Sequence, residues 1–324
     1  LVIDEISMVR ADLLDAVDAV LRRYRHSHLP FGGVQLLMIG DLQQLSPVVK
    51  DNEIQLLKPH YDTFYFFGSH ALKQSRYVTI ELSTIYRQTD ENFVRILNAI
   101  RERRIDANLL NRLNERYLPN FPADKSDGYI RLTTHNHTAQ AYNEQRLNEL
   151  PTKAYAFQAK VEGNFNESLF PADATLLLKQ GAQVMFIRND ETGQGRYYNG
   201  KIGYVESLSQ REIVVQCDDE SFAVEPSEWA NSRYILDEET KEIREEIEGT
   251  FRQYPLRLAW AITIHKSQGL TFEKAVIDAA ASFAHGQVYV ALSRCKSLEG
   301  LVLASPVTAS SIINDSTVSD FMHN

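Results

Sequence analysis

The stretch LVIDEISMV, residues 1–9, decides the expected fold. Leu1, Val2 and Ile3 form an apolar run that predicts a buried strand. Asp4 and Glu5 follow at its carboxyl end, which is where α/β sheets place their ligands. Asp4 is suited to hold a magnesium ion, directly or through water, and Glu5 to orient and deprotonate an attacking water. The plainer interpretation is a strand that ends in acids at a solvent boundary, so the rest of the chain must decide.

A helix and a second strand follow this opening strand. Apolar residues recur at helical spacing over residues 13–24, and a proline and two glycines at residues 30–33 then break the helix. An apolar strand over residues 34–39 ends in Gly40 and Asp41. The order strand, helix, strand predicts an α/β fold in which helices flank a parallel sheet.

Composition limits the classes of protein to consider. The chain has 324 residues, of which 44% are hydrophobic, enough for two or three domains. No apolar run is long enough to cross a membrane and no export leader opens the chain, so a cytoplasmic protein without a membrane partner is expected. The two cysteines, Cys217 and Cys295, fit a reducing compartment. The net charge of −9 argues against coating of nucleic acid by bulk electrostatics but allows a local basic groove.

The texture of the sequence changes in the middle of the chain. Short strand-like runs at residues 183–187, 201–205 and 212–216 are separated by turns rich in glycine and asparagine. Residues 155–255 therefore predict a small β-rich insertion. The α/β texture returns near residue 258, and residues 287–291 are interpreted as a further strand.

Two polar motifs are suited to bind phosphate in the first third of the chain. GDLQQLSPV, residues 40–48, puts Gln43 and Gln44 just beyond a strand end, where an amide can sense a terminal phosphate or align water; the alternative is a polar loop. YRQ, residues 86–88, offers the planar guanidinium of Arg87, for which a surface ion pair is the alternative.

Two more motifs lie near the end of the chain. ITIHKSQGLTF, residues 262–272, combines hydroxyls, an amide, a cation and a glycine after an apolar strand, which is typical of backbone-phosphate recognition. GQVYVALSRCKSLEGL, residues 286–301, is expected to end a strand with Ser293 and Arg294, which places a second guanidinium at a sheet edge.

In this order and at these separations, the motifs resemble those of the superfamily 1B DNA helicases of the Pif-type and RecD-like families. The resemblance implies two RecA-like lobes: an incomplete first lobe at residues 1–80 and a second at residues 81–154 plus 256–324, divided by an SH3-like β-barrel at residues 155–255. It implies an ATP-dependent helicase that moves 5′ to 3′ along single-stranded DNA in DNA repair, recombination or replication. It also implies ATP and magnesium as cofactors, single-stranded and tailed duplex DNA as partners, and a monomer.

The same resemblance implies roles for particular residues. Asp4 takes the metal role and Glu5 the role of the base, Gln44 senses phosphate, and Arg87 and Arg294 act as arginine fingers. Gly269 joins these five residues around the nucleotide. Contacts to DNA are implied for Asn136, Thr263, His265, Lys266, Ser267 and Gln268. His135 stands where the family often has a hydroxyl, so no role is carried over to it.

One departure from the family stands out. Nowhere in the sequence is there a G-x-x-x-x-G-K-[ST] loop, which cradles the phosphates and whose hydroxyl meets magnesium. The family has this loop upstream of the acidic pair, so the chain is expected to be a fragment that hydrolyses ATP poorly by itself. Two alternatives stay open: a RecD-like subunit of an exodeoxyribonuclease complex with nuclease partners, and an inactive module that binds single strands or another protein.

Overall fold

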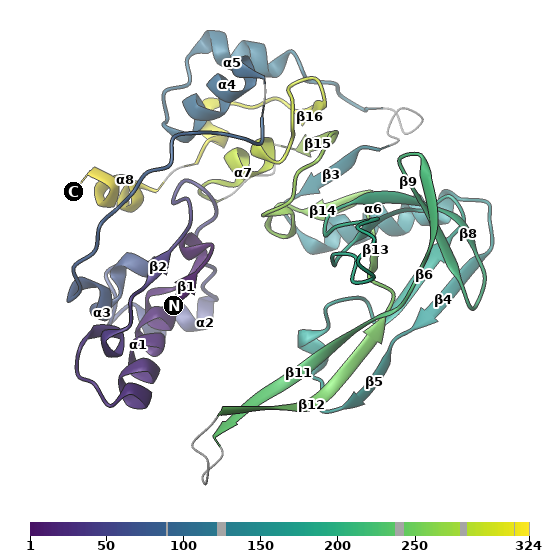
Figure 1. Cartoon of the computed structure of the whole chain (residues 1–324). Helices are drawn as coiled ribbons and strands as arrows, with labels where there is room; N and C mark the ends of the chain where they lie inside the picture. Colours follow the sequence, from purple (N-terminus) through teal and green to yellow (C-terminus); the bar gives the residue numbers. More distant parts are fainter. Residues whose placement is uncertain (89, 122–127, 237–242, 279–283, 314, 324) are drawn as a thin grey trace. The chain divides into compact units, whose positions relative to one another are not determined.

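The structure, a computed structural model, describes residues 1–88, 90–121, 128–236, 243–278, 284–313 and 315–323. It is a mixed α/β protein with parallel strand pairs (Figure 1). The chain divides into two compact units, Leu1–Phe121 with Glu273–Asn324, and Pro122–Phe272. The division into three domains expected from the sequence stays a prediction.

The first unit opens with the predicted strand, helix and strand. β1 (Val2–Ile3) pairs in parallel with β2 (Leu37–Met38), and α1 (Ala11–Arg25) connects them. The prediction of a buried strand is wrong, because Leu1 and Val2 are 51% and 61% exposed. Within the described residues β1 and β2 form a sheet of only two strands, which is too narrow to cover its own apolar side chains.

The buried face of α1 also differs from the simplest apolar pattern. Leu14 is fully buried, whereas Leu13, Val20 and Tyr24 are exposed. Asp18 lies on the buried face, where its carboxylate accepts hydrogen bonds from Phe31 N and Arg22 Nε. A buried carboxylate with two donors satisfies the rule that buried charges are paired, but apolar spacing does not reveal it.

The rest of the first unit consists of short helices and one strand pair. β15 (Ala275–Asp278) pairs in parallel with β16 (Leu301–Ser305). Asp90 caps the helix α4 (Glu91–Arg101), because its side chain accepts from two backbone N–H groups. The remaining helices are α2 (Asp51–Leu57), α3 (His70–Lys73), α5 (Ala107–Asn114), α7 (Gln287–Ser293) and α8 (Ser316–His323).

The strand predicted at residues 287–291 is wrong, because these residues form helix α7. The helix is buried nearly all round, so its sequence shows a continuous apolar run rather than a stripe. Periodicity alone cannot distinguish such a run from a buried strand. Gly286 precedes the helix in the left-handed conformation, with φ 73°.

The second unit contains a parallel pair and three antiparallel sheets. β3 (Ile130–Thr133) and β14 (Ala261–Thr263) are parallel, and α6 (Asn136–Glu149) follows β3. The first antiparallel sheet has the strand order β10 (Glu220–Val224), β9 (Ile213–Cys217), β8 (Ile202–Leu208), β7 (Gln183–Phe186) and β13 (Leu256–Leu258). The second has the order β11 (Ser227–Leu236), β12 (Ile243–Gln253) and β5 (Lys160–Gly163). The third consists of β4 (Ala154–Gln158) and β6 (Thr175–Lys179).

These antiparallel sheets confirm a β-rich middle region, but closure into an SH3-like barrel stays a prediction. The long pair β11 and β12 in Figure 1 continues beyond β5, which pairs with residues 249–252 of β12. In the part of the chain that the structure describes, no helix is long and apolar enough to span a membrane.

Candidate active site

The two acids of the opening motif sit on a strained turn. Glu5 has φ 50° and ψ 43°, a left-handed conformation, and precedes the short helix η1 (Ile6–Met8). Its backbone N–H donates to Asp4 Oδ1 at 2.9 Å. Asp4 is exposed and Glu5 half-buried. Left-handed backbone is costly for residues other than glycine, and such strain is concentrated at functional sites.

The turn after β2 packs directly against this acidic turn. Ile6 N donates to Ile39 O at 2.9 Å. A Cβ at Gly40 would lie 2.9 Å from Ile6 Cγ2 and 3.0 Å from Ile6 N, so glycine is what allows the two turns to approach. The motifs DEIS and GDLQQ are therefore neighbours in space.

Asp41 organises the second turn. Its backbone O accepts from Gln44 N and its Oδ1 accepts from Gln43 N, both at 3.0 Å. The Gln44 amide points to Asp41 Oδ2 at 3.4 Å, and Arg101 Nε lies 3.6 Å from the same oxygen. Gln44 is thus held by a neighbouring carboxylate in this arrangement, close to the acidic turn.

Arg294 stands at the end of α7 and is only 2% exposed. Its Nε donates to Val290 O at 3.1 Å and its Nη2 to Ser293 Oγ at 3.0 Å. Burial lowers the pKa of Arg294 to about 10, and the positive charge of Arg87 adds to this effect. Tyr289, Glu5 and Asp41 act in the opposite direction, so the guanidinium remains charged at neutral pH.

The structure therefore brings together Glu5, Arg87 and Arg294, which the sequence predicted as site residues, and Asp41, which lies in the GDLQQ motif. Glu5, Arg87 and Arg294 come from three separated motifs, and the charges of Glu5, Arg87 and Asp41 all act on the Arg294 guanidinium. The positive charge of Arg87 disfavours the charged form of the buried Arg294, and an anion such as a phosphate relieves that effect. The donor set consequently fits a polyphosphate.

Gln88 is a residue of this site that the sequence reasoning missed. Its side chain is buried, and its Nε2 donates to Ser293 O at 2.9 Å and to Cys295 O at 3.2 Å. These carbonyls flank Arg294, so Gln88 fastens the YRQ segment, and Arg87 with it, to the end of α7. Its position directly after Arg87 in the YRQ motif is the feature of the sequence that could have identified it.

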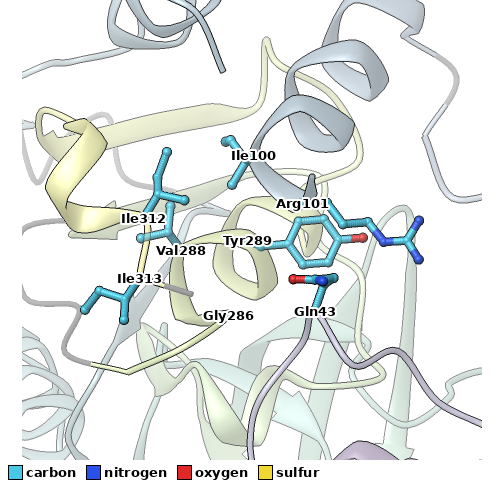
Figure 2. Close-up of a pocket in the computed structure, with 8 residues that line it drawn as sticks. All are labelled: Gln43, Ile100, Arg101, Gly286, Val288, Tyr289, Ile312 and Ile313. Atoms are coloured by element: carbon cyan, nitrogen blue, oxygen red, sulfur yellow. The ribbon is translucent and has the colours of Figure 1, made fainter. Parts of the chain in front are cut away.

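A small cavity lies beside the first residues of α7 (Figure 2). It is lined by Gln43, Ile100, Arg101, Gly286, Val288, Tyr289, Ile312 and Ile313 and has a volume of about 10 Å³. That volume accommodates one water molecule, so this cavity is too small for a nucleotide. Figure 2 shows the Tyr289 ring between Gln43 and Arg101. Burial, followed by the charge of Asp41, raises the pKa of the Tyr289 hydroxyl to about 12.

Magnesium fits this site only together with other ligands. Within the described residues, no group of three His, Cys, Asp or Glu side chains is arranged to hold a metal ion. Magnesium commonly takes one or two carboxylates and completes its shell with water and phosphate oxygens. The exposed carboxylate of Asp4 is available as one such carboxylate ligand.

The residues expected to contact DNA belong to the second unit. Thr133 and Thr263 are register partners in the parallel pair, so both strands end at one edge, and Ile264 N donates to Thr133 O at 2.8 Å. Asn136 begins α6 and is exposed close to that edge. The structure thus brings the Asn136 segment and the HKSQG segment together.

The HKSQG side chains differ in their surroundings. Thr263 and Ser267 are buried, and Ser267 Oγ donates to Ile264 O at 2.7 Å, so both act within their own turn. Lys266 and Gly269 are exposed, while His265 and Gln268 are half-buried. Burial lowers the pKa of His265, and burial, followed by the charge of Arg257, lowers the pKa of Lys266.

Asn143 is a second residue that the sequence reasoning missed. Its Nδ2 donates to Ala261 O and its Oδ1 accepts from Ala261 N, both at 2.8 Å. The amide thereby takes the place of a neighbouring strand beside β14. It fixes the strand that leads into HKSQG.

Comparisons with known proteins identify a family and solved structures that this chain resembles. The family model described as PIF1-like helicase matches residues 1–109. An unliganded Pif1 from Bacteroides is 40% identical with a TM-score of 0.87, and the match covers 100% of this chain and 75% of that one. For Bacteroides Pif1 in complex with ADP-AlF4, the identity is 40%, the TM-score 0.88 and the coverage 100% and 74%.

Among curated relatives, the human ATP-dependent DNA helicase PIF1 is 36% identical over 321 residues, covering 93% of this chain and 45% of the relative. The chain spans about half the length of the first curated relatives that it matches. Identity of 40% across nearly three quarters of a solved Pif1 helicase decides the classification. The chain belongs to the PIF1-like helicase family.

Proposed function

We propose that this chain forms part of an ATP-dependent DNA helicase that translocates 5′ to 3′ on single-stranded DNA and acts in DNA repair, recombination or replication. The observation that carries the proposal is the packing of separate motifs: the acidic turn lies against Gly40, and Gln88, next to Arg87, donates hydrogen bonds to the carbonyls on either side of Arg294. Relatives solved with ADP-AlF4, and with ADP-AlF3 and single-stranded DNA, support both the nucleotide and the strand.

Each residue of the cluster has a chemical role in this proposal. Asp4 holds magnesium, which when bound supplies positive charge to the phosphates. Glu5 orients the attacking water and accepts its proton. The guanidiniums of Arg87 and Arg294 neutralise charge that develops on the phosphates in the transition state.

Gln44 and Gly269 are the two other residues proposed to contact the nucleotide. Gln44 senses the phosphate, and Gly269 allows the phosphate to come close to the backbone. The Gln44 amide exchanges its contact with Asp41 for a phosphate oxygen or the water, which couples the nucleotide state to the turn after β2. Gly269 has φ 77° and no atom within 4 Å of a built Cβ, so its backbone is open to a phosphate.

In the second unit, Asn136, His265, Lys266 and Gln268 contact the DNA backbone, and the buried hydroxyls of Thr263 and Ser267 shape the turn that presents them. A relative is described as unwinding forked double-stranded DNA as two coordinating Pif1 helicases. We therefore include tailed duplex DNA among the substrates. Monomeric state and cytoplasmic location remain predictions.

The test uses the whole polypeptide encoded by the reading frame that contains these 324 residues. We expect ATP hydrolysis stimulated by single-stranded DNA and unwinding of duplexes with a 5′ tail. Glu5→Gln and Arg294→Ala should each lower kcat at least about 100-fold while DNA binding persists. Hydrolysis that survives both substitutions would refute the assigned roles. The 324-residue chain by itself should hydrolyse ATP poorly, since it carries no phosphate-cradling loop.

The second candidate is an inactive module that binds single strands or another protein, and the absence of a phosphate-cradling loop from the whole polypeptide would favour it. Salt-sensitive strand binding by the whole polypeptide, without any DNA-stimulated hydrolysis, would support it. A nuclease subunit that copurifies with an active helicase would instead favour a subunit of a RecD-like complex.

A further inference from the structure

The turn at residues 41–44 contacts His285 and Gly286, the two residues that precede α7. His285 is buried, and its Nε2 lies 2.9 Å from Leu42 O. Gly286 lies so close that a Cβ there would sit 2.3 Å from Gln44 O and 2.7 Å from Gln43 O. The start of the helix that ends at Arg294 therefore carries the turn that holds Gln44.

Chemistry fixes the tautomer of His285. The carbonyl of Leu42 can only accept, so Nε2 carries the proton and donates it. Nδ1 accepts from Asp315 N at 3.0 Å. Both ring nitrogens are thus used, each toward a different segment, and the neutral ring matches both partners.

We infer that His285 is a positioning residue, whose Nε2–H holds the turn of Gln44 on α7 so that the sensing amide and Arg294 move as one body. This inference rests on the proposed function. Gln44 and Arg294 belong to motifs about 250 residues apart in the sequence, and α7 is the element that both share. Loss of the Leu42 bond would free the turn while leaving Arg294 in place.

Two amide substitutions separate the two bonds of His285. A glutamine places an N–H donor near the position of Nε2, so His285→Gln keeps the bond to Leu42 and loses the acceptor for Asp315. An asparagine places a carbonyl acceptor near Nδ1, so His285→Asn keeps Asp315 and loses Leu42. Both variants change the side chain by similar amounts, which makes each the control of the other.

Amide hydrogen exchange on the 324-residue chain is the first readout. We expect His285→Asn to speed exchange at Gln43 and Gln44 about tenfold and leave Asp315 unchanged, and His285→Gln to show the reverse. Equal changes at both places in both variants would overturn the inference, because they would indicate a general packing role. If His285→Asn does not fold, His285→Met replaces it; this variant loses both bonds, so it should speed exchange at Gln43, Gln44 and Asp315, whereas His285→Gln should speed it at Asp315 alone. If His285→Gln folds and neither of the other two variants does, the bond to Leu42 serves folding and the inference is overturned.

Hydrolysis by the whole polypeptide is the second readout. His285→Asn should lower kcat about tenfold with KM unchanged, and His285→Gln should stay within about twofold of the unsubstituted protein. Equal kcat in both variants beside an active parent would refute the positioning role alone. An inactive parent would refute the proposed function, and the exchange pattern would still decide whether His285 holds the turn.

Discussion

Replacing Gly286 with alanine measures how closely the turn at residues 41–44 sits on α7. The added Cβ would lie 2.3 Å from Gln44 O and 2.6 Å from Gln44 C, far inside ordinary contact. Gly286 also has φ 73°, a conformation that side chains disfavour. The substitution therefore adds a steric cost to a conformational one.

The two costs have known sizes. A left-handed residue other than glycine costs about 1–2 kcal/mol. Forcing a packed neighbour to shift costs about 1–3 kcal/mol more. For a unit of this size each kcal/mol lowers Tm by about 2–4 °C, so Gly286→Ala should lower the Tm of the first unit by roughly 10 °C.

Gly33 offers a matched control in the same unit. Its φ is 74°, but the nearest atom to a built Cβ is Leu29 Cδ1 at 3.5 Å, which is an ordinary contact. Gly33→Ala should therefore show the conformational cost alone, roughly 3–6 °C. Calorimetry of both variants provides the comparison. A Gly286→Ala variant as stable as Gly33→Ala would refute the close seating of the turn on α7.

Three further predictions concern stability and reactivity. Gln88→Ala leaves two buried carbonyls without their shared donor and should cost about 2 kcal/mol in urea unfolding, against less than about 0.5 kcal/mol for the exposed Gln74→Ala; equal costs would contradict its role as a fastener. Burial acts to raise the pKa of Asp15, but hydrogen bonds from the start of α3 and from Tyr61 outweigh it and lower that pKa. Asp15→Asn should therefore be less stable than the unsubstituted chain by about 1–2 kcal/mol at pH 7, and the gap should close as the pH falls below 3.8 toward the lowered folded-state pKa; a gap independent of pH would rule this out. Burial raises the pKa of both Cys217 and Cys295 to about 11, so iodoacetamide at about pH 8 should label them only after unfolding, and mass spectrometry of the native chain would expose an error as rapid labelling.

Local sequence signals predicted the parts of the fold that depend on neighbours in the chain. The order strand, helix, strand around α1 follows from periodicity, and the structure has it. Periodicity failed at α7, where burial on all sides removes the polar face that identifies a helix. It also failed for the burial of β1, because burial depends on what covers a strand.

The candidate site shows the same division. Charged residues such as Glu5 and Arg294 are conspicuous in a sequence because few structural roles need them at the end of an apolar run. Gln88, Asn143 and His285 act through neutral hydrogen bonds to backbone atoms of distant segments. No spacing rule marks such partners, since the carbonyl that accepts belongs to any residue type.

The left-handed backbone of Glu5 has a consequence for how this chain can vary over time. Glycine or asparagine would fit that conformation better, so a lineage released from selection for hydrolysis would gain stability by drifting to either residue. A glutamate retained at this position therefore indicates continued selection for hydrolysis. The identity of residue 5 in a set of related genes would therefore separate lineages that still hydrolyse nucleotide from those that have stopped.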